Sequence, residues 1–106
     1  MRRLLALVLV AACAPALAAG NADSGKQKSQ TCAACHGPDG NNPTGPDFPR
    51  LAGQHYDYLL KALRDYKSGA RKDPIMAAQA VALSPQDMAD LAAYFSDQKG
   101  SLHVVR

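Results

Sequence analysis

The chain has 106 residues, which is room for one small domain. Its 12 Lys and Arg side chains oppose nine acidic ones, so the formal net charge is +3; without the two arginines of the first three residues, the balance is ten against nine. With basic and acidic side chains so evenly balanced, the chain has no excess of positive charge to bind a phosphate backbone, and we expect no nucleic-acid partner.

The N-terminus has the three parts of a secretory signal peptide. Two arginines are followed by an unbroken apolar run over residues 4–12 and by the small-x-small cleavage site Ala16-Leu17-Ala18. The apolar run is too short for a permanent membrane span. We therefore predict a signal peptide over residues 1–18, a mature domain over residues 19–106, and export to the periplasm.

Cys13 offers a second interpretation of the same segment. Val10-Ala11-Ala12-Cys13 resembles a loose lipoprotein box, in which Cys13 would be acylated and become the mature N-terminus. The later Ala-x-Ala site favours the soluble product. Attachment to the membrane through Cys13 stays open as the alternative.

The mature chain begins with a weak helix signal and then the most informative motif. Residues 21–35 predict a short helix with Asp23 or Ser24 as its cap. At its end, Cys32-Ala33-Ala34-Cys35-His36 has the spacing of covalent haem c attachment. The two thiols add across the two vinyl groups of one porphyrin, and the imidazole of His36 then becomes an iron ligand. A domain this small has a marginal hydrophobic core, and the haem is a large apolar disc against which its side chains can pack.

Two other uses of a Cys-x-x-Cys motif are weaker. A zinc site needs further ligands, and beyond His36 the chain offers only His55, His103 and Cys13, without a second cysteine pair. A thioredoxin-like motif requires a βαβ setting, and no strand pattern lies nearby.

Residues 37–49 are rich in Gly and Pro and predict a loop. Residues 54–68 predict an amphipathic helix that Gly69 ends. The last predicted helix begins with Ser84 as its cap and Pro85 in the first helical position. It is expected to end at Lys99 and Gly100.

The second axial ligand of the iron decides between electron transfer and ligand binding. Met76 is the expected ligand, because it follows Pro74 in a stretch predicted to be irregular, where a loop can present its sulfur. The alternatives are less suited to this role. Met88 lies on the apolar face of the last helix and fits a core methionine, His55 fits an exposed or capping side chain, and His103 lies in the tail.

The order of these elements resembles class I cytochrome c over nearly all of the mature chain. Residues 32–41, 48–54 and 91–100 are most similar to one half of the bacterial tandem dihaem cytochromes c. The resemblance implies an all-α fold of three to five short helices around one haem. Those relatives continue into a second haem half, so we expect either a natural single-haem carrier or a truncated reading frame.

The resemblance also assigns residues. It implies one haem c bound through Cys32 and Cys35, with His36 and Met76 on the iron. It implies a proline carbonyl that accepts the Nδ1 proton of His36, which we assign to Pro46 with Pro43 as the competitor. Finally, it implies a close crossing of the first and last helices, with Gly25 against Tyr94 or Phe95.

The expected function is that of a periplasmic electron carrier rather than an enzyme, with no small-molecule substrate. The resemblance implies a quinol-oxidising cytochrome complex as donor and a terminal oxidase as acceptor. Two alternatives stay open. The first alternative is a haem subunit dedicated to one dehydrogenase. The second is a haem peroxidase or gas-binding protein whose iron has an open sixth position.

Overall fold

The computed structural model describes residues 4–11 and 19–100, and this part of the chain holds five helices and no strand. The all-α prediction is therefore confirmed. The helices are α1 (Ala22–Lys28), α2 (Gln30–His36), α3 (Tyr56–Ser68), α4 (Pro74–Ala80) and α5 (Pro85–Asp97). None of the described helices is long and apolar enough to cross a membrane.

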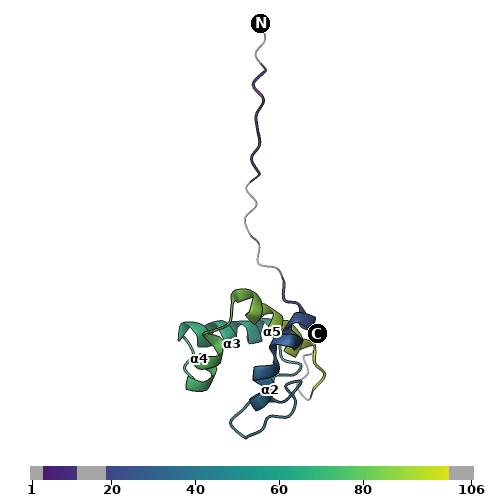
Figure 1. Ribbon diagram of the computed structural model, residues 1–106, viewed down its shortest axis with the longest axis vertical. Coiled ribbons are helices and arrows are strands. Elements are labelled where there is room, and N and C mark those ends of the chain that lie inside the picture. Colours follow the sequence, from purple (N-terminus) through teal and green to yellow (C-terminus); the bar gives the residue numbers. More distant parts are fainter. Residues whose placement is uncertain (1–3, 12–18, 101–106) are drawn as a thin grey trace.

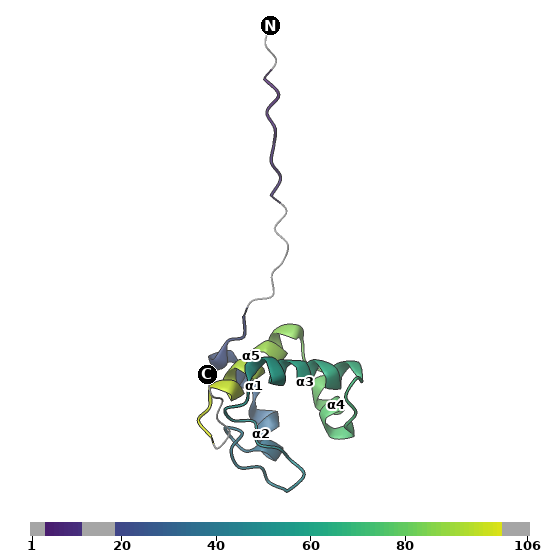
Figure 2. The same cartoon turned by 180° about the vertical axis from the view of Figure 1, so that it is seen from behind.

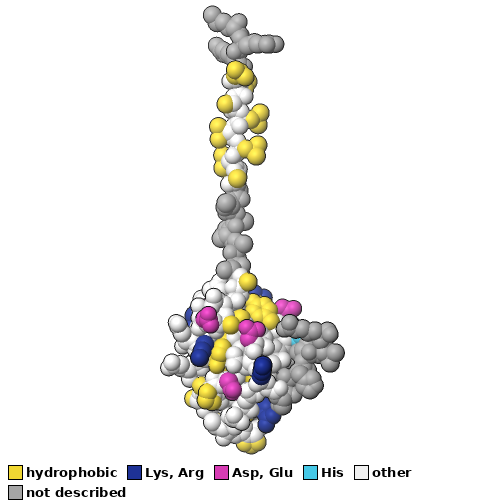
Figure 3. Space-filling view, turned by 90° about the vertical axis from the view of Figure 1, so that its right-hand side faces the viewer, with side chains coloured by type: hydrophobic (Ala, Val, Ile, Leu, Met, Phe, Trp, Pro, Cys, Tyr) yellow, Lys and Arg dark blue, Asp and Glu magenta, His cyan; other side chains and the backbone are white. Residues whose placement is uncertain are grey.

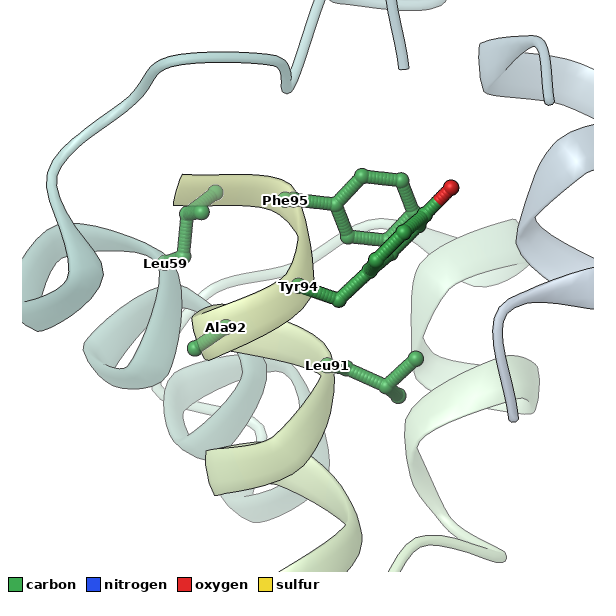
Figure 4. Close-up of a cluster of buried hydrophobic side chains, with 5 residues drawn as sticks. All are labelled: Leu59, Leu91, Ala92, Tyr94 and Phe95. Atoms are coloured by element: carbon green, nitrogen blue, oxygen red, sulfur yellow. The ribbon is translucent and has the colours of Figure 1, made fainter. Parts of the chain in front are cut away.

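Helix α5 is the centre of the domain. It packs against α1 and α3, whereas α4 packs against α3 and α2 adjoins α1. In Figures 1 and 2, α2 and α4 lie at opposite ends of the α3–α5 layer and project to the same side of it. The buried cluster that holds this layer together consists of Leu59, Leu91, Ala92, Tyr94 and Phe95 (Figure 4).

Local sequence signals explain α3 and α5. As predicted, α3 ends at Ser68, with Gly69 in a left-handed conformation as its C-cap. In α5, the Ser84 hydroxyl accepts the backbone N–H of Asp87 while the Asp87 carboxylate accepts that of Ser84, which completes the predicted capping box. The helix ends at Asp97, before the predicted closure by Lys99 and Gly100.

The helix predicted over residues 21–35 is in fact two helices. Its cap is Asn21, whose side-chain oxygen accepts the N–H of Ser24 at 2.9 Å. The break comes at Ser29, because its hydroxyl donates to the Lys26 carbonyl at 2.7 Å and so competes with the backbone pairing of a continuous helix.

The close crossing of α1 and α5 is confirmed at Gly25. A Cβ atom on Gly25 would lie 2.0 Å from the Asp90 carbonyl oxygen and 2.7 Å from the Cβ of Tyr94. The aromatic partner is thus Tyr94 rather than Phe95. Glycine is needed here because the two backbones approach too closely for any side chain.

The stretch around Met76 was predicted to be irregular, and this was wrong. Met76 lies in α4, which starts at Pro74 with Asp73 as its N-cap. Proline suits the first position of a helix, since its missing N–H has no helical partner there. Pro74 therefore starts a helix instead of breaking one.

Candidate haem site

Helix α2 presents the whole Cys-x-x-Cys-His motif within its last two turns. Cys32 and Cys35 are three residues apart and so lie on one side of the helix, and both thiols are free. Burial raises the pKa of the Cys32 thiol, which packs against the core cluster. Cys32 is therefore held as the neutral thiol at neutral pH, which disfavours oxidation through the thiolate.

His36 is the last residue of α2 and is only 6% exposed. Its Nδ1 lies 2.8 Å from the carbonyl oxygen of Pro49. A carbonyl can only accept, so Nδ1 carries the proton and donates it. Nε2 is left with its lone pair and has no protein partner in the described residues, which is the state that an iron ligand requires.

The prediction that Pro46 accepts this proton was wrong, as was its competitor Pro43. Pro46 lies inside a turn that the Phe48 N–H closes onto the Gly45 carbonyl at 3.2 Å. The chain reaches His36 only after this turn, where the Phe48 ring meets the imidazole edge-on at 6.3 Å between centroids. The next residue, Pro49, therefore supplies the carbonyl. Proline spacing alone does not reveal the path of the loop.

Several hydrogen bonds fix the loop that supplies Pro49. Thr44 N–H donates to the Cys35 carbonyl at 2.9 Å, and Leu51 N–H donates to the Gly40 carbonyl at 2.9 Å. The Tyr94 hydroxyl donates to the Pro38 carbonyl at 3.1 Å, which ties the start of the loop to α5. The imidazole is thus held from both its helix and its loop.

Gly37 allows this arrangement. It follows His36 with φ of 87°, and a Cβ there would come within 2.6 Å of the Asn42 carbonyl oxygen. Any other residue would be strained in this left-handed conformation and would also collide with the loop.

Met76 lies on α4, across the molecule from α2, and is half-buried. No Cα atom of α2 lies within 8 Å of one in α4. Helices α2 and α4, which carry the proposed iron ligands, therefore do not pack directly against each other. The two free thiols and the oriented imidazole are the groups that covalent haem attachment requires on the α2 side.

The other candidate ligands have different roles or lie outside the described residues. Met88 is buried in the core, as predicted, and His55 is an exposed N-cap of α3. His103 and Cys13 fall outside residues 4–11 and 19–100. Within those ranges, no group of three or more His, Cys, Asp or Glu side chains is placed to hold a metal ion, which leaves the zinc alternative without ligands there.

Comparison with known proteins identifies relatives of this chain. The Cytochrome c family model matches residues 22–99. Cytochrome c4 of Pseudomonas aeruginosa is 52% identical over 85 residues, which cover 80% of this chain and 42% of that protein. The thiosulfate dehydrogenase electron acceptor of Stutzerimonas stutzeri is 46% identical over 65 residues, which cover 61% of this chain and 30% of that protein.

A solved structure shows the same fold. Reduced recombinant cytochrome c4 from Pseudomonas stutzeri aligns with a TM-score of 0.73 and 48% identity, covering 79% of this chain and 48% of that one. This confirms the class I cytochrome c fold. The chain spans less than half the length of these relatives.

The helical fold and the Cys-x-x-Cys-His turn are those of a cytochrome c, for which haem c is the expected cofactor. The chain belongs to the cytochrome c family.

Proposed function

We propose that this chain carries electrons through a haem that Cys32 and Cys35 hold covalently and whose iron His36 and Met76 ligate. The observation that carries the proposal is the His36 imidazole, which is buried and has its Nδ1 proton fixed on the Pro49 carbonyl. An imidazole held in one tautomer offers Nε2 to iron without further rearrangement.

The bound haem supplies a one-electron iron couple. The residues of the chain decide how it is used. The soft thioether of Met76 favours ferrous iron and so raises the reduction potential relative to a second histidine. Two protein ligands also leave no position for oxygen or peroxide, which favours electron transfer over the peroxidase and gas-binding alternatives.

Met76→Ala tests the ligand set. We expect the variant to lose the weak sulfur-to-iron absorption band of the ferric protein and to bind carbon monoxide when reduced at neutral pH. Met88→Leu is the matched control, because Met88 is buried in the core and should leave both spectra unchanged. A band that persists in Met76→Ala would move the ligand to another residue.

For the partners, we propose a quinol-oxidising cytochrome complex as donor and a terminal oxidase as acceptor. On the face drawn in Figure 3, basic and acidic side chains are interspersed, which suits brief docking more than tight binding. The test is the rate at which a purified quinol-oxidising complex reduces the protein. Transfer that is no faster than with the quinol alone would contradict this assignment.

A second candidate partner is a dehydrogenase that delivers its electrons directly. It is supported by the resemblance to a thiosulfate dehydrogenase electron acceptor. Stopped-flow mixing with thiosulfate dehydrogenase and thiosulfate measures this route. Reduction at least tenfold faster than by the quinol-oxidising complex would favour the dedicated role.

We also propose that residues 1–18 are removed on export to the periplasm. Residues 4–11 form no helix, and their Leu and Val side chains are 80–97% exposed (Figure 3). The folded part starts close behind, because the Asn21 N–H already donates to the Asp90 carboxylate at 2.8 Å. N-terminal sequencing of the exported protein should begin at Ala19. An acylated Cys13 at the N-terminus would instead support membrane anchoring.

A further inference from the structure

Helix α4, which carries Met76, has one close helical neighbour among the described helices. It has seven residues, and α3 is the only described helix whose backbone comes close to it. A helix this short gains little from its own hydrogen bonds. Its position therefore depends on packing against α3 and on the contacts at its two ends.

The end beyond Ala80 is held by packing and by one hydrogen bond. Ala80 is fully buried, and the Lys67 ammonium donates to the Leu83 carbonyl just beyond the helix. The Leu83 N–H in turn donates to the Ala80 carbonyl at 3.0 Å. These contacts lie one turn or more away from Met76 and do not reach the first turn of α4.

The first turn is held by Asp73. One oxygen of its carboxylate, Oδ1, accepts the backbone N–H of Ile75 and that of Met76, each at 3.0 Å. Pro74 occupies the first helical position and has no N–H to offer. The amide of the proposed ligand residue is therefore bound directly by the cap.

The orientation of this turn determines which side chain faces inward. Successive residues of a helix point about 100° apart, so Met76 and Ala80 share one side while Ile75 points elsewhere. The structure agrees, because Ala80 is buried, Met76 is half-buried and Ile75 is 54% exposed. The backbone bond from the Ala77 N–H to the Asp73 carbonyl, at 2.8 Å, also spans this turn, but the amide of Met76 itself is bound by the Asp73 carboxylate.

We propose that Asp73 is a positioning residue for Met76: its carboxylate holds the first turn of α4 closed and so keeps the thioether on the iron. This inference rests on the proposed function, because it takes Met76 as the sixth ligand. Without the cap, the thioether would leave the iron for a larger fraction of the time and external ligands would compete more successfully.

Azide binding to the ferric holo-protein measures this competition. We expect Asp73→Ala to bind azide about fivefold more tightly, as the loss of a typical N-cap implies. Asp73→Asn keeps a capping side chain and should stay within about twofold of wild type. Asp73→Glu keeps the charge but caps poorly, and it should behave like the alanine variant.

Ser84→Ala is the matched control, because it removes the same kind of cap from α5. It should lower the melting temperature without changing azide affinity. Wild-type azide affinity in both Asp73→Ala and Asp73→Glu would overturn the inference, as would an equal change in Ser84→Ala. If Asp73→Ala fails to accumulate with haem, the comparison of Asp73→Glu with Asp73→Asn decides.

Met76→Ala distinguishes a wrong ligand set from a wrong role for Asp73. If Met76→Ala binds azide no better than wild type, the proposed ligand set is wrong and the role of Asp73 falls with it. If Met76→Ala binds azide far more tightly while the Asp73 variants match wild type, the ligand set stands and only the positioning role is rejected.

Discussion

At the scale of single residues, Lys28 shows how a polar side chain serves in a helix crossing. Its ammonium lies 2.8 Å from Asp87 Oδ1 and 2.6 Å from Asp90 Oδ2, which joins α1 to α5. Asp90 is only 3% exposed and also accepts from the Asn21 N–H and the Gln86 amide. The buried carboxylate is thus fully partnered, and removing one partner leaves it uncompensated.

The pKa values of these groups predict an acid-dependent contribution. Hydrogen bonds from Lys28 lower the pKa of Asp90 and, together with the Ser84 backbone, lower that of Asp87 from 3.8 to about 2. A carboxyl whose pKa is depressed on folding stabilises the fold above its unfolded pKa, and this is lost as the pH falls toward the folded pKa.

Lys28→Met should therefore melt several degrees below wild type at pH 7. The difference should shrink as the pH falls from about 4 to about 2, because the wild-type carboxylates then begin to take up protons and lose their pairing with Lys28. Lys26→Met, two residues earlier in the same helix, is the control, because no ion pair of Lys26 is found among the described residues. A Lys28→Met deficit that stays constant down to pH 2 would show that the carboxylates are not its cause.

At the scale of the elements, α1 and α5 meet at Gly25 without room for a methyl group. Gly25→Ala forces the added carbon against the Asp90 carbonyl, so we expect a loss of about 1–3 kcal/mol in the free energy of unfolding, measured with denaturant on the holo-protein. Gly45→Ala is the control, because its nearest new contact is the Phe48 ring at 3.4 Å. Equal stability of the two variants would contradict the close crossing.

The sequence predicted those elements whose signals are local. The spacing of apolar residues and Gly69 indicated α3, and Ser84-Pro85 with Asp87 indicated α5. The same signal of a cap followed by proline stands at Asp73-Pro74, so the start of α4 was also present in the sequence, although an irregular stretch was predicted there.

The predictions that failed for lack of information depend on tertiary structure. The acceptor for His36 depends on the path of a loop without regular structure, and neither Pro46 nor Pro49 carries a local mark. The break at Ser29 depends on the hydrogen bond from its hydroxyl to the Lys26 carbonyl. A serine side chain can make this bond or leave the helix continuous, and the sequence does not tell which. The Cys-x-x-Cys-His motif was found because chemistry fixes its spacing.

At the scale of the whole molecule, the helices enclose a small core that lies mainly on α5. Four of the five residues in the buried cluster come from α5, and α2 and α4 each have one close helical neighbour. Both ligand-bearing helices therefore lack much of the apolar contact that usually holds helices in place. A haem between them would supply it.

Haem-free protein, obtained from Cys32→Ser with Cys35→Ser, should be poorly folded. We expect less than half of the helical circular dichroism of the holo-protein and no cooperative thermal transition, because a domain of this size buries little apolar surface without its haem. Near-native circular dichroism of the haem-free chain would show that α2 and α4 stand without the cofactor.

The proposed function requires one haem joined covalently to Cys32 and Cys35. It is tested most directly by the intact mass of the protein exported from a host that matures c-type cytochromes. We predict the mass of the exported polypeptide plus one haem, and a haem that acidified acetone does not extract. A mass equal to the polypeptide alone would contradict the account.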